Sequence, residues 1–489
     1  MTLQILNRLS RINLLQAGII IVPIFIGLMI GAACLLVPYD MVLFGIIGVA
    51  GLFIMSIRPE IGILAIVAIT SNLINPDKLP LVKAGPISFH IPDLILVFLL
   101  FMVIFKILNS KDTRFVHSPL DIPVILFCIA SFISVIIAVL NPSSGINFIL
   151  RRYRPIMYYW IFFVVTNLVV KKRQLLLLIY GLIIIAVMAS VLMFAQVIFP
   201  SMDIIASRSQ SLITAGQSFT GIERLYFQGD RIIYVLLLIV LTSFITKGNM
   251  LPAWLEFGLI GIIGVGEFFT FQRNYWLTIV VMVALLFAML SRDGRNRFFQ
   301  WITSCVLLFF IAINIPGFPV QYLDAAVDRI TRGIELDTLA QDTSTQYRVN
   351  ETRYAFQTIQ EKPFTGIGLG NYYRPAFPNE APWNNETNLR WYIHNSYLWV
   401  WIDMGLIGII PFVWFYAAAV IRSLKRWRKV GDSRLRAFVL GSTLGVLGQS
   451  ISNFVAPNFI QSWVLAIFPL VIGMNEVILR SELHTKDER

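Results

Sequence analysis

Long apolar runs recur along this chain from one end to the other, separated by short polar segments. A helix that crosses a bilayer needs about 20 predominantly apolar residues, and these runs have that length. Of the 489 residues, 57% are hydrophobic and 13% are charged, which is more apolar length than one soluble core uses. The sequence therefore predicts an all-α membrane protein with many spans, and no nucleic-acid partner in spite of its formal net charge of +12.

About fourteen runs qualify as spans, although the second and third are also compatible with a hairpin that does not cross fully. Their predicted limits are 17–38, 41–57, 60–76, 91–109, 120–140, 150–170, 174–199, 231–247, 251–271, 274–291, 297–315, 395–421, 434–454 and 458–479. This pattern predicts five regions: an N-terminal transmembrane bundle (1–200), an outer loop (201–230), central transmembrane helices (231–315), a large extracytoplasmic loop (316–394), and C-terminal helices with a cytoplasmic tail (395–489).

The basic residues predict the orientation of these spans. With a cytoplasmic N-terminus, 23 of the 39 Lys and Arg fall on the cytoplasmic side, so the positive-inside rule favours both termini there. The loops at about 200–230 and 316–394 then face outward. The basic residues on that outer face comprise three lysines and thirteen arginines. Because a guanidinium suits bidentate contact with phosphate or carboxylate, the outer face is predicted to bind an anion.

Several of these arginines lie at the ends of spans. Arg151, Arg152 and Arg154 lead directly into an apolar run, where they either contact lipid headgroups or belong to the anion site. Arg273 lies between two spans joined by almost no loop, and a charge there favours a functional site over a helix-end anchor. Arg224 precedes another span, as a ligand residue or as the partner of a loop carboxylate.

The large outer loop carries the most distinctive motifs. The segments VQYLDAAVDRITRG and STQYRVNETRYAFQTIQEKP each predict a short helix, and Arg348 falls in the first turn of the second. A glycine-rich run, KPFTGIGLGNYY, follows, and we interpret it as a sharp turn rather than a phosphate loop because it lacks a strand–loop–helix context. The segment HNSYLWVWIDMGLIG then places His394 where the next span begins.

This order of motifs resembles the signature of the O-antigen ligase and O-antigen polymerase superfamily, bacterial membrane glycosyltransferases that use polyprenyl-diphosphate-linked sugars. The resemblance covers roughly residues 345–410. It implies a GT-C-like helical fold with a helical extracytoplasmic loop domain over a lateral cavity open to lipid. It also implies that Arg273, Arg348 and His394 are essential residues on the outer side, and that Arg224 matches a further basic position for the diphosphate.

The chemistry that this resemblance implies needs cations at the diphosphate and a base for the acceptor hydroxyl. Arg273, Arg348 and Arg224 are the candidates for the diphosphate, and His394 for the base. The alternative for His394 is a structural hydrogen bond to the loop backbone. Acidic residues are scattered in the outer loops and the three cysteines lie in apolar runs, so we expect no metal and no other cofactor.

The leading hypothesis is an inverting glycosyltransferase of the bacterial cytoplasmic (inner) membrane. Its expected partners are a polyprenyl-diphosphate-linked glycan donor, a glycan or glycolipid acceptor, the lipid bilayer, and a chain-length regulator as a further candidate. A polymerase of lipid-linked repeat units fits the same motifs. From other classes, a non-catalytic scaffold stays open, as does a lipid-linked glycan transporter, for which Glu267 and Asp403 are the candidate ionisable residues within spans.

Overall fold

The computed structural model of this chain describes residues 39–489 apart from eleven short gaps, at 75–78, 85–86, 110–114, 200–207, 215–216, 227–228, 316–319, 332–342, 377–388, 461–462 and 488–489. The predicted first span, 17–38, lies outside the described residues. Contacts divide the chain into two compact units, Met1–Ile61 and Gly62–Arg489. Helix α2 (Tyr39–Ile57) belongs to the first unit, and α3 (Pro59–Thr70) begins there and continues into the second.

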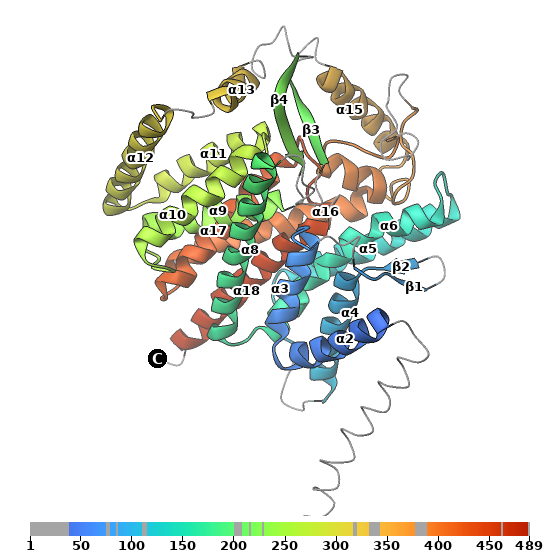
Figure 1. Cartoon of the computed structure of the whole chain (residues 1–489). Helices are drawn as coiled ribbons and strands as arrows, with labels where there is room; N and C mark the ends of the chain where they lie inside the picture. The colour runs from blue at the N-terminus through green and yellow to red at the C-terminus, as the bar shows by residue number, and fades with distance from the viewer. Residues whose placement is uncertain are drawn as a thin grey trace, which may run out of the picture. The chain divides into compact units, whose positions relative to one another are not determined.

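The described part of the second unit is built mainly from helices (Figure 1). They are α4 (Ile91–Asn109), α5 (Asp121–Leu140), α6 (Ile146–Met157), α7 (Ile161–Leu168), α8 (Lys172–Ile198), α9 (Asp230–Thr246), α10 (Ala253–Phe269), α11 (Arg273–Met289), α12 (Arg292–Ile313), α13 (Val320–Thr331), α15 (Thr343–Glu361), α16 (Ser396–Arg426), α17 (Ser433–Ser452) and α18 (Ile467–Asp487). Three 3-10 turns, Tyr158–Trp160, Trp427–Lys429 and Trp463–Ala466, lie between them.

Five helices among the described residues are long and apolar enough to cross a membrane. They are Ile91–Asn109, Asp121–Leu140, Lys172–Ile198, Arg292–Ile313 and Ser396–Lys429. Each overlaps a predicted span, and α4 has the predicted limits. The chain is therefore a multi-pass helical membrane protein, as expected, while the total of fourteen spans stays a prediction.

The predicted span over 150–170 is not one regular α-helix. Helix α6 ends at Met157, a 3-10 turn follows, and α7 begins at Ile161. Pro155 lies inside the last turn of α6, where it has no N–H to donate and its ring disfavours a regular helix. All eight residues of α7 are buried, so this segment is part of the protein interior and does not face lipid.

Helix α9 forms the centre of the bundle. It is buried on nearly every face and packs against α17, α10, α8 and α11. A glycine of α17 allows one of these contacts, because a Cβ atom at Gly441 would lie 2.6 Å from the Cα atom of Ile239. Small residues of this kind let two membrane helices approach closely. The packing fixes the start of α9, where Asp230 and Arg231 lie.

Both helices predicted in the large outer loop are confirmed, as α13 and α15. Helix α13 packs through Ala325 and Ala326 on Phe271, in the turn between α10 and α11. The sequence did not predict the antiparallel hairpin of β3 (Arg208–Thr214) and β4 (Gln217–Tyr226) in the loop before α9. In Figure 1 this hairpin lies at the same end of the second unit as α13 and α15.

A second, smaller antiparallel hairpin precedes α4. It pairs β1 (Val82–Ala84) with β2 (Ile87–Phe89), so that Val82 lies opposite Phe89 and Ala84 opposite Ile87. The following residue, His90, donates its backbone N–H to Asp93 in the first turn of α4 at 2.9 Å. The hairpin thus leads directly into the N-terminal turn of a span.

The glycine-rich run lies along a break in α16. Gly405 has a φ of 64° in the middle of that helix, and the backbone of 363–368 hydrogen-bonds to the interrupted turn. The N–H of Ile367 donates to the carbonyl of Ile402 at 2.8 Å, and that of Leu406 donates to Pro363 at 2.9 Å. At Gly366 a Cβ atom would lie 2.4 Å from the Ile402 carbonyl oxygen. The glycines therefore serve the close contact between loop and helix.

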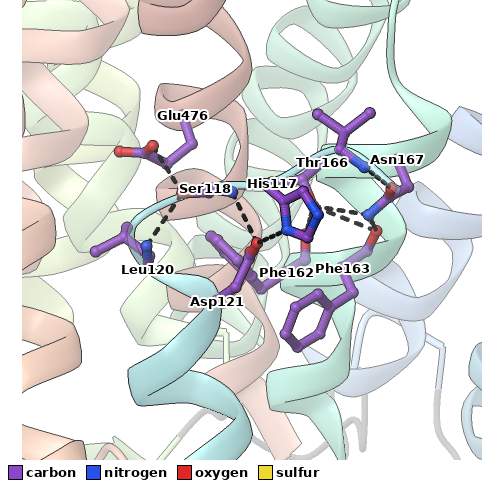
Figure 2. Close-up of polar contacts among 10 residues, drawn as sticks. His117, Ser118, Leu120, Asp121, Phe162, Phe163, Thr166, Asn167 and Glu476 are labelled. Atoms are coloured by element: carbon purple, nitrogen blue, oxygen red, sulfur yellow. Dashed lines mark hydrogen bonds and ion pairs between the residues drawn. The ribbon is translucent and has the colours of Figure 1, made fainter. Parts of the chain in front are cut away.

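A polar cluster ties α5, α7 and α18 together near the segment before α5 (Figure 2). The backbone N–H of Ser118 donates to Asp121 Oδ2 at 2.7 Å, and its hydroxyl donates to Glu476 Oε2 at 2.9 Å. Arg422 of α16 donates two hydrogen bonds to Glu476, both of 3.0 Å. These residues belong to the ends of spans that the positive-inside rule assigns to the cytoplasm.

Candidate active site

His394 is held at the start of α16 by the residue that follows it. The side chain of Asn395 accepts hydrogen bonds from the backbone N–H groups of Tyr397 and Leu398, at 2.9 Å and 3.1 Å. Asparagine is a preferred N-cap for this reason, so the HNSYL sequence explains why the helix begins at Ser396. The cap fixes the backbone next to the imidazole.

A buried carboxylate from α15 contacts His394 twice. Glu351 Oε2 lies 2.8 Å from the ring nitrogen Nδ1 and accepts the backbone N–H of His394 at 3.1 Å. The Glu351 side chain is 4% exposed and that of His394 is 33% exposed, so the carboxylate is shielded while the imidazole is accessible. Because Nδ1 faces an acceptor, a neutral ring has its proton there, which leaves Nε2 free to accept another.

Tyr392 connects this pair to three arginines. Its ring packs edge-on against the His394 ring, with centroids 4.7 Å apart. Burial raises the pKa of the Tyr392 hydroxyl, and so does the negative charge of Glu351. The guanidinium groups of Arg348, Arg231 and Arg152 act in the opposite sense on the same pKa. These three cations therefore lie within the range of Coulomb interaction of the Tyr392 hydroxyl, whose ring contacts His394.

Arg152 is packed between aromatic rings rather than extended to the lipid headgroups. Its guanidinium carbon lies 4.4 Å from the ring centroids of both Trp391 and Trp399. The residue is buried, and Trp399 donates its indole N–H to Asp403 Oδ2 at 3.0 Å. Such cation–π contacts are strongest where water is excluded, so Arg152 is a structural part of the site.

A buried polar network lies beneath the loop that carries His394. Ser396 donates its hydroxyl to Asn453 Oδ1 at 2.9 Å, and the N–H of Asn458 donates to the same oxygen at 2.9 Å. Arg231 then donates to Asn458 Oδ1 at 2.6 Å and to Asp230 Oδ1 at 2.9 Å. The network joins the first turns of α9 and α16 through the turn after α17.

Arg273 occupies the first position of α11, and its side chain is exposed. Its Nη1 atom donates to the carbonyl of Arg329 in α13 at 3.3 Å, and Arg329 in turn donates to the carbonyl of Phe271 at 2.8 Å. The flanking residues reach the buried network, because Gln272 donates to Asp230 and Asn274 donates to Ser452 at 2.7 Å. Arg273 thus lies next to Gln272, at the end of the network that begins at Ser396.

The fourth predicted residue, Arg224, lies in β4 opposite Gln210 of β3. Its backbone position is described, and its side chain is not among the described side chains. The structure therefore brings His394 into contact with Glu351 and Tyr392, and it places Arg348 on the same helix as Glu351 and within Coulomb range of Tyr392. It places Arg273 at the α10–α11 turn and Arg224 on the hairpin.

Sequence reasoning did not single out Glu351, Arg231 or Tyr392 as site residues, although Arg231 is one of the thirteen outer arginines. The sequence did contain a sign that Glu351 lies near the site. Glu351 comes three positions after Arg348, so the two residues share a face of α15. Nothing in the sequence indicated that Arg231 would be largely buried. For a metal, the described residues contain no cluster of three or more His, Cys, Asp or Glu side chains.

These observations define a class: a multi-pass helical membrane protein in which a loop helix brings a carboxylate to a histidine at the mouth of a span. Residues 257–413 match the model of a protein family described as O-antigen ligase. The match begins in α10, contains Arg273, α13, α15 and His394, and ends in α16. The match confirms, over this segment, the predicted resemblance to the O-antigen ligase and polymerase superfamily. No curated protein matches the chain.

Proposed function

We propose that this protein is an inverting, metal-independent glycosyltransferase of the bacterial cytoplasmic membrane. It moves an oligosaccharide or polysaccharide from a polyprenyl diphosphate to an acceptor hydroxyl on the outer side, as an O-antigen ligase does. The family match to residues 257–413 supports an enzyme of this general kind. Donor, acceptor and residue roles are part of the proposal.

His394 acts as the base in this reaction. Its Nε2 atom takes the proton of the acceptor hydroxyl while the acceptor oxygen attacks the anomeric carbon of the donor sugar. The bond from that carbon to the diphosphate breaks, its electron pair goes to the phosphate oxygen, and the anomeric configuration inverts. A positioned base contributes about 10²–10⁴ in rate. Glu351 orients the ring and stabilises the imidazolium that forms, because one of its oxygens contacts Nδ1.

The arginines act on the leaving group. Negative charge grows on the diphosphate as the bond breaks, so fixed cations stabilise the transition state more than the ground state. Arg348 is exposed, and its charge reaches the hydroxyl of Tyr392 beside His394, which favours a role at the diphosphate. Arg273 and Arg224 are proposed for the same anion from the α10–α11 turn and from the hairpin. For both arginines to contact the diphosphate, the bound donor must extend between the hairpin and the α10–α11 turn.

The observation that carries this proposal is the contact between Glu351 and His394, a shielded carboxylate behind an accessible imidazole. This contact favours catalysis over a purely structural histidine. The backbone N–H of His394 already donates to Glu351, so the loop is attached to α15 without the imidazole. The ring nitrogen Nε2 is then available for a substrate.

Transfer of glycan from a purified lipid-linked donor, with the protein in detergent, tests the proposal. We expect His394→Ala to lower kcat by about 10²–10⁴ while donor binding is retained. We expect Arg348→Ala to weaken donor binding and transfer together. The matched control for Arg348→Ala is Arg353→Ala, an exposed arginine on the same helix, and that for His394→Ala is His117→Ala. Unchanged transfer by His394→Ala and Arg348→Ala contradicts the residue roles.

A polymerase of lipid-linked repeat units would use the same donor chemistry with a different acceptor. The mass of the product from a defined donor separates the two activities. A product that gains one donor glycan on a lipid or cell-wall acceptor indicates a ligase. A ladder of repeat units on the polyprenyl diphosphate indicates a polymerase.

A further inference from the structure

Glu267, near the end of α10, is a buried carboxyl group that the proposed reaction does not use. The residue is 2% exposed. Neither of its carboxylate oxygens has a hydrogen-bond partner among the residues that the structure describes. An ionised carboxylate in such a place is costly unless another group neutralises it.

The neighbouring charges do not neutralise Glu267. The charged groups that act on it are Asp230 and Arg231, in the first turn of α9. Arg231 already pairs with Asp230, at 2.9 Å between Nη1 and Oδ1. The two carboxylates of Asp230 and Glu267 share one guanidinium, and Arg231 pairs with Asp230. An ionised Glu267 would therefore be a buried negative charge without a counter-charge.

Among the residues that the structure describes, the other elements around Glu267 bring no further cation to it. Tyr234 of α9 and Tyr275 of α11 lie within Coulomb range, and both are neutral phenols. The titratable side chains of α8 are Lys172, Arg173 and Tyr180, all in its first half, whereas Ser190 and Gln196 are the buried polar residues near its end. From α13, the charged Arg329 donates to the carbonyl of Phe271, and its charge is not one of those that act on Glu267.

We propose that Glu267, with Asp230 and Arg231 beside it, forms a binding site for one monovalent cation, either a proton or a sodium ion. A proton on the carboxyl group or a sodium ion between its oxygens removes the uncompensated charge. The chemistry required is the same in both cases: a small cation of charge one that enters a buried oxygen site.

This cation site adjoins the candidate active site through Arg231. Arg231 lies in Coulomb range of Tyr392 as well as of Glu267, and it donates to Asn458 in the network beneath His394. Occupation of the site leaves Asp230 as the carboxylate that pairs with Arg231, beside the hydrogen bond from Arg231 to Asn458. The inference is independent of glycan transfer, because it rests on the charge and burial of these three side chains.

Dicyclohexylcarbodiimide, an apolar reagent that attacks protonated carboxyl groups within membranes, tests the site in the unmodified protein. We expect the peptide containing Glu267 to be labelled. The peptide containing the exposed Glu361 serves as the control in the same digest and should stay unlabelled. Lower labelling in sodium chloride than in choline chloride at equal concentration identifies sodium as the ligand, and equal labelling identifies the proton. Absence of Glu267 labelling in choline chloride at every pH overturns the proposal.

Thermal unfolding of Glu267→Gln gives a second test. A carboxyl that stays protonated in the folded protein but ionises in the unfolded chain makes the folded state less stable as pH rises. Between about pH 5 and pH 8, the Tm of the wild type should therefore fall by about 1–2 °C per pH unit relative to Glu267→Gln. Sodium chloride should reduce this difference if sodium binds. Parallel pH dependence of the two proteins in choline chloride contradicts the proposal, and neither readout involves transfer.

Discussion

Glu351 and His394 are 43 positions apart in the chain, and one carboxylate oxygen of Glu351 contacts both the backbone and the ring of His394. The pair therefore depends on how α15 docks beside the start of α16. If Glu351 orients the imidazole, Glu351→Ala should lower kcat for transfer by about 10²–10⁴, with a smaller change in the KM for donor. Steady-state kinetics with a defined lipid-linked donor measure this.

The double variant Glu351→Ala with His394→Ala separates cooperation from independent effects. Residues that act as one unit give losses that do not add, so the double variant should be about as slow as His394→Ala alone. Glu351→Gln, which keeps a hydrogen-bond acceptor without the charge, should fall between the wild type and Glu351→Ala. Additive losses would mean that the two residues act separately.

The break in α16 leads to a prediction about stability. At Gly405 the φ of 64° disfavours any side chain, and a Cβ atom would lie 2.1 Å from the carbonyl oxygen of Phe364. Gly405→Ala should therefore lower the free energy of unfolding by about 2–4 kcal/mol, measured by thermal or chemical unfolding in detergent.

Gly258 provides the matched control for this substitution. It lies inside α10, where a Cβ atom would have no described neighbour within 4 Å beyond the backbone of its own helix. Gly258→Ala should therefore be neutral or stabilise the protein by up to about 1 kcal/mol. Equal effects of the two substitutions would show that the contact with the 363–368 backbone is unimportant for stability.

The apolar runs predicted most of the described helices because hydrophobic length reports directly on bilayer thickness. The change from α-helix to 3-10 turn after Pro155 is an exception. An apolar run indicates which residues can be buried, but it does not indicate that they form one regular helix. Amphipathic spacing likewise predicted α13 and α15. The Glu351–His394 contact was not predictable, because it depends on how α15 packs beside the start of α16.

The polar cluster of Figure 2 predicts a strong effect at Glu476. Its carboxylate accepts two hydrogen bonds from Arg422 and one from Ser118, and both charged side chains are mostly buried. Glu476→Ala leaves the guanidinium without its counter-charge, so we expect a loss of about 3–5 kcal/mol in stability. Lys425→Ala, at an exposed position of α16, should change the Tm little.

We predict that Asp432, the N-cap residue of α17, makes a pH-dependent contribution to the stability of the protein. Partial burial raises its pKa, but hydrogen bonds from Lys172 and Arg434 and from the backbone N–H groups of the next turn outweigh this and lower the pKa from 3.8 to about 2. The carboxylate therefore stabilises the fold above about pH 4, and this contribution is lost as the pH falls through about 2.

Asp432→Asn tests that contribution while it keeps an oxygen to cap α17. Because Lys172 and Arg434 are partly exposed, we reduce the expected effect for solvent screening to about 1–2 kcal/mol at neutral pH. Unfolding measured as a function of pH should show the two proteins converging in strong acid. A constant difference at all pH values would assign the effect to the cap instead of the charge.

The arginines show where sequence reasoning reaches its limit. A guanidinium beside an apolar run is equally consistent with a lipid contact, an aromatic contact and an anion site. In the structure Arg152 packs between two tryptophan rings and Arg231 binds a carboxylate and an amide. Arg348 instead is exposed, and its charge acts on the Tyr392 hydroxyl. These differences arise from tertiary packing, which residue type and spacing along the chain do not encode.

The main-chain hydrogen bonds between 363–368 and α16 have a mechanical consequence. Helix α15 ends at Glu361, immediately before this segment, so these bonds tie the end of α15 to the middle of α16. A hinge motion cannot separate the two at this point without breaking those bonds. If the protein transfers a glycan as proposed, we therefore expect the carboxylate and the imidazole to stay assembled throughout turnover, while other elements move to admit the donor.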